Sequence, residues 1–226
     1  MIYFDNVSKI YNGNEPALQD ITLSIEPSEF VSIVGHSGAG KTTLLKMLLA
    51  EDSPTGGSIF FESTNIHSLN RDALNKLRRR IGMVFQDFRL IPNKTVYENI
   101  AFAMEAAGRS EEEIATDVPY VLDLVDLGSK IWSFPRELSG GEQQRVAIAR
   151  AIVNQPDVVI ADEPTGNLDP VSTFDIVQIL KKINDLGTTV LLTTHNKGVI
   201  DSLGRRVITM DGGRVIRDDK SGRYAL

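Results

Sequence analysis

The sequence predicts an α/β fold, in which a parallel sheet is flanked by helices and interrupted by a helical insertion. Three short apolar runs, at residues 30–34, 158–161 and 190–192, have the composition of strands that are buried on both faces. Segments of helical periodicity separate these runs, as they do in parallel sheets with crossover helices. A chain of 226 residues with 42% hydrophobic side chains is long and apolar enough to build such a core as one domain.

An antiparallel β-subdomain is expected before the parallel core. Residues 2–7 and 21–25 alternate in polarity, which is typical of strands with one buried face. The turn-forming residues Asn12, Gly13 and Asn14 stand between these segments. We therefore expect the two strands to be neighbours.

Two helices of the core have clear sequence signals. Residues 41–49 place four leucines on one side of a helix. Asp169 followed by Pro170 has the form of an N-cap and a first helical residue, and an apolar stripe follows at residues 176–183.

The segment 88–150 is predicted to be mostly helical. Capping boxes mark two helix starts in it, at the pairs Ser110–Glu113 and Ser139–Glu142, and we expect Pro119 to restart a helix. We interpret this segment as a helical subdomain inserted between core segments 1–87 and 151–226 of a single domain.

Composition excludes several classes of function. The net charge is −6 and the pI about 5.2, so a strongly basic surface is excluded and no nucleic-acid partner is expected. The absence of cysteine excludes disulfides, thiolate metal sites and a cysteine nucleophile. The sequence has neither a secretory signal pattern nor an apolar run that approaches the roughly 18 residues of a membrane span. We expect a cytoplasmic protein that reaches any membrane through a partner.

The strongest local signal is the segment 35–42, which fits the pattern G-x-x-x-x-G-K-[ST]. Glycines let such a loop wrap tightly, so that backbone N–H groups point at phosphate oxygens, and the following helix adds the positive end of its dipole. Lys41 supplies a charge for the β- and γ-phosphates, and the Thr42 hydroxyl is a ligand for Mg²⁺. His36 is interpreted as a spacer residue of the loop.

Acidic and imidazole side chains follow two further strands. The run 158–161 ends in Asp162, which suits a Mg²⁺ ion, and in Glu163, which strand alternation directs to the other side as a base for water. Alone, such acids are more often solvated strand ends, but the phosphate loop favours the functional interpretation. His195 follows the run 190–192, and a single histidine is usually structural.

A second anion-binding helix start is indicated at residues 138–145. Gly140 and Gly141 fall in the first turn of a helix, where glycine lowers helical stability but leaves N–H groups closely approachable. An ordinary capping box of small residues explains the same pattern, so this segment alone decides nothing.

Together these motifs resemble the nucleotide-binding subunits of ABC (ATP-binding cassette) transporters. The resemblance covers nearly all 226 residues, with the motifs in that family's order. Glu142 stands where the family often has glutamine. The matching segments are the Walker A loop (35–42), the Q-loop glutamine (Gln86), the signature (138–143), Walker B with the catalytic glutamate (158–163), the D-loop (167–169), the switch histidine (His195) and the adenine-stacking aromatic (Tyr11).

The resemblance implies a RecA-like P-loop NTPase fold, ATP and Mg²⁺ as cofactors, and ATP hydrolysis. It implies that two copies pair head to tail on ATP binding and that Glu163 activates water, His195 contacts the γ-phosphate and Gln86 links the nucleotide to an integral membrane partner. The implied Mg²⁺ ligands are Thr42, Gln86 and Asp162. The implied nucleotide-binding residues are Tyr11, Gly35, His36, Ser37, Gly38, Ala39, Gly40, Lys41, Thr42, Thr43, Ser139, Gly140, Gly141, Glu142 and Asp169.

Finer features are similar to the branch that contains cell-division, lipoprotein-release and macrolide-export ATPases. The segments 85–90, 161–169 and 194–197 favour the cell-division group, which implies control of cell-wall hydrolysis from the cytoplasmic face of the membrane. The alternatives are an exporter ATPase, a nucleotide-gated module that hardly hydrolyses, and a DNA-repair or translation protein. For the basic cluster at Lys76, Arg78, Arg79 and Arg80, a partner or lipid contact and a solvated helix end remain alternatives.

Overall fold

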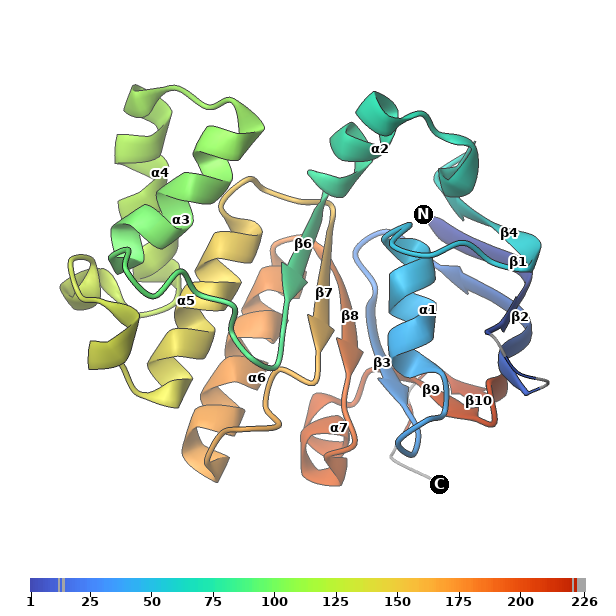
Figure 1. Cartoon of the computed structure of the whole chain (residues 1–226). Helices are drawn as coiled ribbons and strands as arrows, with labels where there is room; N and C mark the ends of the chain where they lie inside the picture. The colour runs from blue at the N-terminus through green and yellow to red at the C-terminus, as the bar shows by residue number, and fades with distance from the viewer. Residues whose placement is uncertain (12, 14, 221, 223–226) are drawn as a thin grey trace.

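A computed structural model describes residues 1–11, 13, 15–220 and 222 of the chain (Figure 1). The predicted turn at Asn12 and Asn14 lies outside the described residues. Within them, a six-stranded sheet forms the core. Its strands, in spatial order, are β10 (Arg214–Asp219), β9 (Arg206–Asp211), β3 (Phe30–Val34), β8 (Thr189–Thr193), β7 (Val158–Asp162) and β6 (Ile81–Val84).

The core sheet is parallel from β9 to β6, and β10 is an antiparallel edge strand. The three predicted runs are β3, β7 and β8. The sequence pattern did not indicate β6, β9 and β10, since β10 is largely exposed and β6 has only four residues.

A second, antiparallel sheet contains the N-terminal strands, as predicted. Its described strands are β2 (Pro16–Ile25), β1 (Ile2–Ile10), β4 (Gly56–Phe61) and β5 (Thr64–Asn65), in spatial order. β1 and β2 extend beyond the segments that the alternation of polarity predicted. Their full length was not visible in the sequence, because register shifts after Phe4 and after Val7 break the alternation of buried and exposed residues.

The helices cover the core sheet on both faces (Figure 1). Short 3₁₀ turns lie at Ile66–Ser68, Gly128–Lys130 and Pro135–Glu137. The α-helices of the described residues are α1 (Lys41–Leu48), α2 (Arg71–Arg78), α3 (Val96–Ala107), α4 (Glu111–Leu124), α5 (Gly140–Ile152), α6 (Pro170–Asp185) and α7 (Lys197–Leu203).

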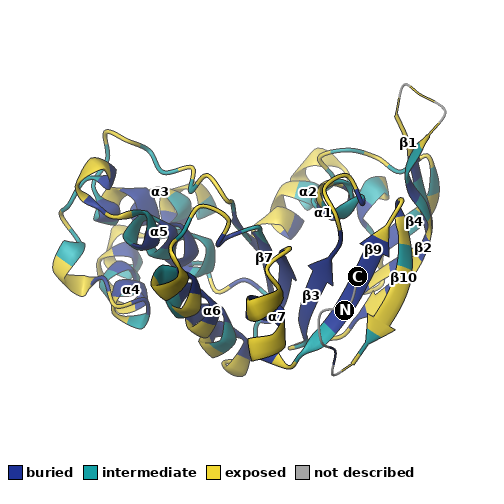
Figure 2. Cartoon of the chain, turned by 90° about the horizontal axis from the view of Figure 1, so that it is seen from below, coloured by how far each residue is buried: buried dark blue, intermediate teal, exposed yellow. Residues whose placement is uncertain are grey.

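Successive residues of the core strands pack alternately into two hydrophobic clusters, one on each face of the core sheet (Figure 2). Val159 and Ala161 of β7 pack in the cluster with helices α3 to α6, whereas Val158 and Ile160 pack in the cluster with α1 and the antiparallel sheet. This double burial explains why β7 is apolar at four consecutive positions. The observed architecture confirms the predicted α/β fold, with a parallel core, an antiparallel β part and inserted helices.

The predicted helix starts at Ser110, Ser139 and Asp169 are all N-caps, and both predicted capping boxes are present. The prediction for Pro119 is wrong, because α4 continues through it to Leu124. Proline removes only one helical hydrogen bond, and residues on both sides of it, such as Val118 and Leu122, are fully buried against the helical cluster.

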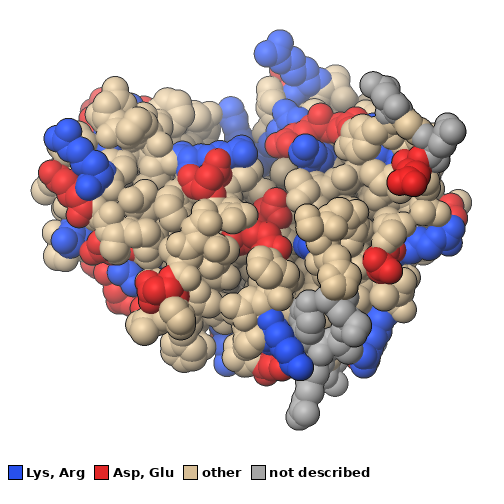
Figure 3. All heavy atoms as spheres, turned by 60° about the horizontal axis from the view of Figure 1, so that its bottom comes forward, with Lys and Arg blue, Asp and Glu red and all other residues tan. Residues whose placement is uncertain are grey.

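The basic cluster of α2 is bound to its own chain. Arg78 donates to the backbone oxygens of Leu49 and Ala50, where α1 ends, and Arg79 donates to the backbone oxygen of Ala106 near the end of α3. Arg80 pairs with Glu62 and Asp157. The arginines therefore satisfy carbonyls at helix C-termini and form an ion-pair network, while Lys76, Arg78 and Arg79 remain exposed to solvent. The cluster is thus a solvated helix end that is also bonded to its own chain, and a contact with a partner or lipid stays a prediction. On the described part of the face in Figure 3, Lys and Arg are interspersed with Asp and Glu.

Candidate functional site

The functional side chains gather at the carboxyl edge of the parallel sheet. β3, β6, β7 and β8 run in the same direction, so the segments that follow them meet at one edge. β3 leads into the glycine-rich loop, β6 into Gln86, β7 into Glu163 and β8 into His195. A pocket of about 580 Å³ lies there, large enough for a nucleotide. It is lined by residues 35–43, Gln86, Asp162, Glu163 and His195.

The loop before α1 needs glycine at its ends. A Cβ atom on Gly35 would lie 2.3 Å from the backbone oxygen of Met210 in β9. Gly40, the N-cap of α1, has φ 102°, and a Cβ there would lie 2.7 Å from the backbone oxygen of Ala17. Because glycine has no side chain, no side-chain cap bonds the first N–H groups of α1. Those groups are left to a ligand.

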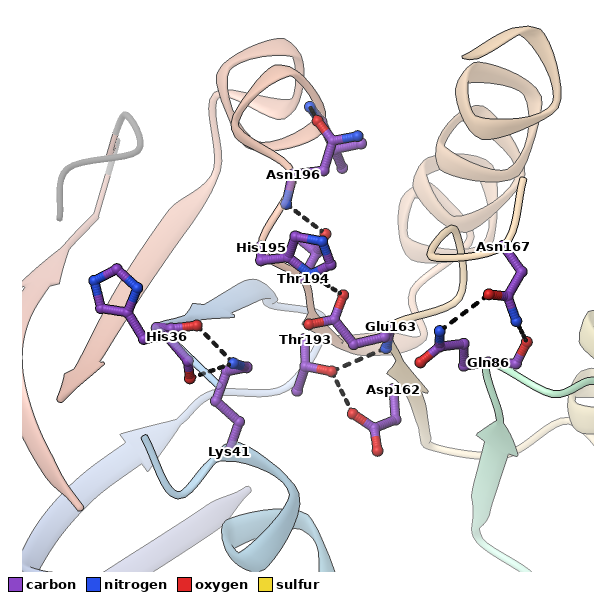
Figure 4. A network of polar contacts seen from close by, with 12 residues as sticks. His36, Lys41, Gln86, Asp162, Glu163, Asn167, Thr193, Thr194, His195 and Asn196 are labelled. Atoms are coloured by element: carbon purple, nitrogen blue, oxygen red, sulfur yellow. Dashed lines mark hydrogen bonds and ion pairs between the residues drawn. The ribbon is translucent and has the colours of Figure 1, made fainter. Parts of the chain in front are cut away.

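Lys41 folds back over the same loop. Its Nζ atom donates to the backbone oxygens of Gly35 at 2.6 Å and His36 at 3.1 Å (Figure 4). The ammonium group is thus held beside the loop by two of the loop's own carbonyl oxygens. A phosphate seated in the loop would meet this charge together with the helix dipole.

Asp162 and Glu163 both line the pocket, which corrects the expectation that strand alternation separates them. β7 ends at Asp162, and Glu163 has a left-handed backbone with φ 48°, so alternation does not continue to it. The N–H of Glu163 donates to the backbone oxygen of Thr193 at 3.1 Å and to its Oγ1 atom at 3.0 Å. These bonds hold a backbone conformation that is unfavourable for a side-chain-bearing residue.

Thr193 also orients Asp162. Its hydroxyl donates to Asp162 Oδ1 at 2.6 Å, since Asp162 and Thr193 are register partners on β7 and β8. Sequence reasoning missed Thr193, because strand register cannot be read from separate segments. One oxygen of Asp162 is thereby fixed by the protein.

His195 lies beside Glu163, with 3.0 Å between His195 Nδ1 and Glu163 Oε2 (Figure 4). The Glu163 side chain is 18% exposed and that of His195 is 70% exposed. The carboxylate is therefore partly enclosed, while the imidazole stands at the open side of the pocket. This arrangement offers a base next to a hydrogen-bonding group.

Gln86 is tied to the D-loop. Its Nε2 atom donates to Asn167 Oδ1 at 3.3 Å, and Asn167 Nδ2 donates to the backbone oxygen of Gln86 at 3.5 Å. In Figure 4 the side-chain oxygen of Gln86 points toward the side where Asp162 and Glu163 lie.

Two residues of α5 hold the backbone around Gln86, and the sequence pattern did not single them out. The fully buried Gln144 donates to the backbone oxygen of Phe85 at 3.3 Å. Arg150 donates to the backbone oxygens of Phe88 and Arg89, at 2.9 and 2.6 Å. Both acceptor residues have left-handed backbones. The signature helix and the Q-loop are therefore bonded together within one chain.

The start of α5 does not reach the pocket. Residues 139–142 and Asp169 are not among the lining residues, and Figures 1 and 2 both show β7 between α5 and α1. Gly141 permits close packing on α6, because a Cβ there would lie 2.6 Å from Ser172 Oγ. Asp169 caps α6 by accepting from the N–H groups of Val171 and Ser172.

At the start of α5, the side chains of Ser139 and Glu142 each accept a hydrogen bond from the backbone N–H of the other residue. Glu142 Oε2 accepts from the Ser139 N–H at 2.7 Å, and Ser139 Oγ accepts from the Glu142 N–H at 3.3 Å. The bond from the Ser139 N–H is the main cause that lowers the pKa of the Glu142 carboxyl below its ordinary value. The N–H groups of Gly140 and Gly141, the first two helical residues, have no carbonyl of α5 to bond.

Tyr11, the expected adenine contact, lies just beyond the end of β1 and is 46% exposed. It does not line the pocket around the glycine-rich loop. No helix among the described residues is long and apolar enough to span a membrane.

Comparison with known proteins identifies the family. The model of the ABC transporter family matches residues 18–166. The cell division ATP-binding protein FtsE of Bacillus subtilis is 48% identical over 99% of this chain and 98% of its own length. FtsE of Mycobacterium tuberculosis is 48% identical over 100% of this chain and 99% of its own, and FtsE of Escherichia coli is 45% identical over 95% and 97%.

Solved structures agree with the sequence relatives. A dimeric post-hydrolysis structure of the ATP-binding cassette MJ0796, bound to ADP and Pi, is 39% identical, with a TM-score of 0.87 over 99% of this chain and 100% of that one. CbiO1 of Clostridium perfringens is 31% identical, with a TM-score of 0.90 over 97% of this chain and 88% of that one. The chain therefore belongs to the ATP-binding subunits of the ABC transporter family, among the FtsE-type cell division ATP-binding proteins.

Proposed function

We propose that this chain hydrolyses ATP between two copies of itself and thereby drives a membrane complex of the FtsE–FtsX type. ATP hydrolysis follows from the family. The observation that carries the proposal is that the predicted site residues lie in two separate places within one chain. Lys41, Gln86, Asp162, Glu163 and His195 share one pocket, while the signature residues of the same chain stay outside it. A site built from one copy alone lacks the second anion-binding helix start.

The pocket fits a nucleotide with Mg²⁺. Among the described residues, no group of three or more His, Cys, Asp or Glu side chains forms a metal cage. Mg²⁺ does not require one, because it keeps several waters and binds through one or two carboxylates together with substrate phosphates. Asp162, Thr42 and Gln86 supply hard oxygen donors around the loop and are the proposed ligands. When bound, the ion neutralises charge on the β- and γ-phosphate oxygens.

Glu163 is the proposed base of the reaction. Its backbone N–H is held by two bonds to Thr193, and its carboxylate lines the pocket. The carboxylate accepts the proton of a water that attacks the γ-phosphorus, while the bond from this phosphorus to the β–γ bridging oxygen breaks and ADP leaves. His195 is the proposed contact for a γ-phosphate oxygen, since its imidazole stands between Glu163 and the open side. Lys41 exchanges its two backbone acceptors for phosphate oxygens.

The remaining contacts come from the second copy. Ser139, Gly140 and Gly141 present a hydroxyl and two N–H groups that bind the γ-phosphate held by the partner copy. The dimeric MJ0796 cassette, one structure of which is bound to ADP and Pi, supports the pairing of two copies. ATP bridges the two copies, and loss of the γ-phosphate on hydrolysis removes the bridge and releases the dimer.

The membrane role rests on the relatives that bear the FtsE name. We propose that the chain binds the cytoplasmic face of the cell membrane through an FtsX-like integral partner, and that closure of the dimer controls cell-wall hydrolysis in cell division. Residues 88–150 are the proposed helical subdomain. We propose that this subdomain moves when Gln86 gains or loses its contact with the nucleotide, and that the movement reaches the membrane partner. The bonds from Gln144 and Arg150 to the Q-loop support this route.

Pull-down from membranes tests the partner. The expected result is capture of an integral protein that performs no substrate extraction. Capture of a lipoprotein-release or macrolide-export permease would overturn the cell-division assignment and leave the ATPase assignment intact.

ATP-driven dimerisation tests the composite site. Glu163→Gln should keep nucleotide binding but slow hydrolysis, so that size-exclusion chromatography with light scattering detects a dimer with Mg²⁺ and ATP and a monomer with ADP. Lys41→Ala added to this variant should return it to a monomer. A Glu163→Gln chain that binds ATP and remains monomeric at high protein concentration would contradict the proposal.

A further inference from the structure

The exposed ring of Tyr11 has a cation on one face. Lys9 Nζ lies over this ring, 4.9 Å from its centroid. A cation at that distance is attracted to the ring's electron-rich face. The residue is 46% exposed, so part of its surface remains available to a ligand.

Lys9 itself is buried and firmly held. The residue is only 8% exposed, and its Nζ atom donates to Asp52 Oδ1 at 2.6 Å and to the backbone oxygen of Ser53 at 2.7 Å. A buried ammonium group needs such partners. Two of its three N–H groups are accounted for by these acceptors, and the same nitrogen lies over the ring of Tyr11.

Asp52 and Ser53 belong to the loop that follows the phosphate-binding helix α1. The same loop is fastened to β1, where the Thr55 N–H donates to the backbone oxygen of Ser8 at 2.8 Å. The hydrogen bond from Lys9 is the main cause that lowers the pKa of the Asp52 carboxyl, and the Tyr11 hydroxyl acts in the same direction. Tyr11, Lys9 and Asp52 therefore form one cluster that connects the end of β1 to the end of α1.

We infer that Lys9, anchored by Asp52 and Ser53, is a positioning residue that fixes the Tyr11 ring for stacking on the adenine base of the nucleotide. This inference rests on the proposed role of Tyr11 as the adenine contact. The ammonium group restricts the ring to one orientation and leaves the opposite face for the base. Because Lys9 does not line the pocket around the glycine-rich loop, its effect is expected to require a base on the ligand.

Calorimetric titration with ADP and with pyrophosphate separates this role from a general one, since pyrophosphate has no base and neither ligand is hydrolysed at the γ-position. Lys9→Met should weaken ADP binding about three- to tenfold, in the range of a cation–π contact, and leave pyrophosphate binding within about twofold. Lys9→Arg, which keeps the cation, should bind ADP with an affinity closer to that of the wild type than Lys9→Met does. Equal losses for both ligands would show a general structural role and overturn the inference.

A double-variant test asks whether Lys9 acts through Tyr11. In a Tyr11→Ala background, Lys9→Met should cause no further loss of ADP affinity, and a full further loss would overturn the inference. If Lys9→Met does not fold, Asp52→Asn, which keeps the cation but weakens its anchor, should give a smaller loss for ADP alone. If Tyr11→Ala leaves ADP binding unchanged, the stacking proposal itself fails. If Tyr11→Ala weakens ADP binding and neither Lys9→Met nor Asp52→Asn does, only the inference about Lys9 fails.

Discussion

The starts of α1 and α5 are both glycine-rich helix N-termini, but they differ in how their N–H groups are satisfied. At α1, Gly40 is the N-cap and no side chain caps the helix. At α5, Ser139 and Glu142 form a capping box within the chain. The α1 start lies in a pocket with Asp162 and Glu163, whereas the α5 start lies outside it. We propose that the first helix start holds a phosphate within a single chain, and that the second does so only when it meets another copy.

Lys41→Ala should have the largest effect, because it removes the charge that meets the phosphates at α1. We expect ADP affinity to fall by at least about 100-fold, as for the loss of charge-assisted hydrogen bonds. Isothermal titration calorimetry measures this. Lys46→Ala is the matched control, since Lys46 is exposed in the last turn of the same helix and should leave the affinity within about twofold. Similar losses for both variants would refute a special role for Lys41.

Ser139→Arg should separate the two helix starts. We expect it to lower ATPase activity at least about tenfold while leaving ADP affinity nearly unchanged, because the bulky side chain blocks the face that meets the partner copy. Steady-state phosphate release and calorimetry measure the two effects. Ser110→Arg is the control, since Ser110 forms the same capping box on α4 and its loss costs only about 1 kcal/mol of stability. Equal ATPase losses in both variants would assign the effect of Ser139 to capping alone.

Thr193→Val tests whether the Thr193 hydroxyl orients Asp162 and Glu163 in the pocket at the start of α1. Loss of the hydroxyl removes the hydrogen bond to Asp162 Oδ1 and one of the two bonds from the Glu163 N–H. We expect kcat to fall about tenfold, as for residues that orient a reacting group without touching the substrate, with a smaller change in ADP affinity. Thr189→Val removes a buried hydroxyl at the other end of β8 and controls for stability. Wild-type kcat in Thr193→Val would show that this hydroxyl does not orient the acids.

The smallest expected effect concerns the capping box at α5. Folding lowers the pKa of Glu142 below its ordinary value of 4.5, so its charge stabilises the fold at neutral pH, and this contribution disappears as pH falls through 4.5 toward the folded pKa. Glu142→Gln should therefore lower Tm by about 1–2 °C at pH 7, with a difference that vanishes in acid. Thermal unfolding across pH checks this. A Tm difference that grows as pH falls would contradict the assigned sign.

The sequence predicted the motifs well because each is a short contiguous pattern. Residues 35–42 and the pair Ser139–Glu142 carry their own local geometry, and both folded as expected. The contacts between motifs were not predictable, since they depend on strand register and helix packing. The bond from Thr193 to Asp162 and those from Arg150 to the Q-loop are of this kind. Glu163 was misplaced because its left-handed backbone ends the alternation of β7.

The most direct measurement is the structure of the Glu163→Gln chain with ATP and Mg²⁺. We predict that the Ser139 hydroxyl of one copy lies about 3 Å from a γ-phosphate oxygen of the nucleotide held by Lys41 of the other copy. A nucleotide enclosed by a single copy, with residues 139–141 of every copy in solvent, would contradict it.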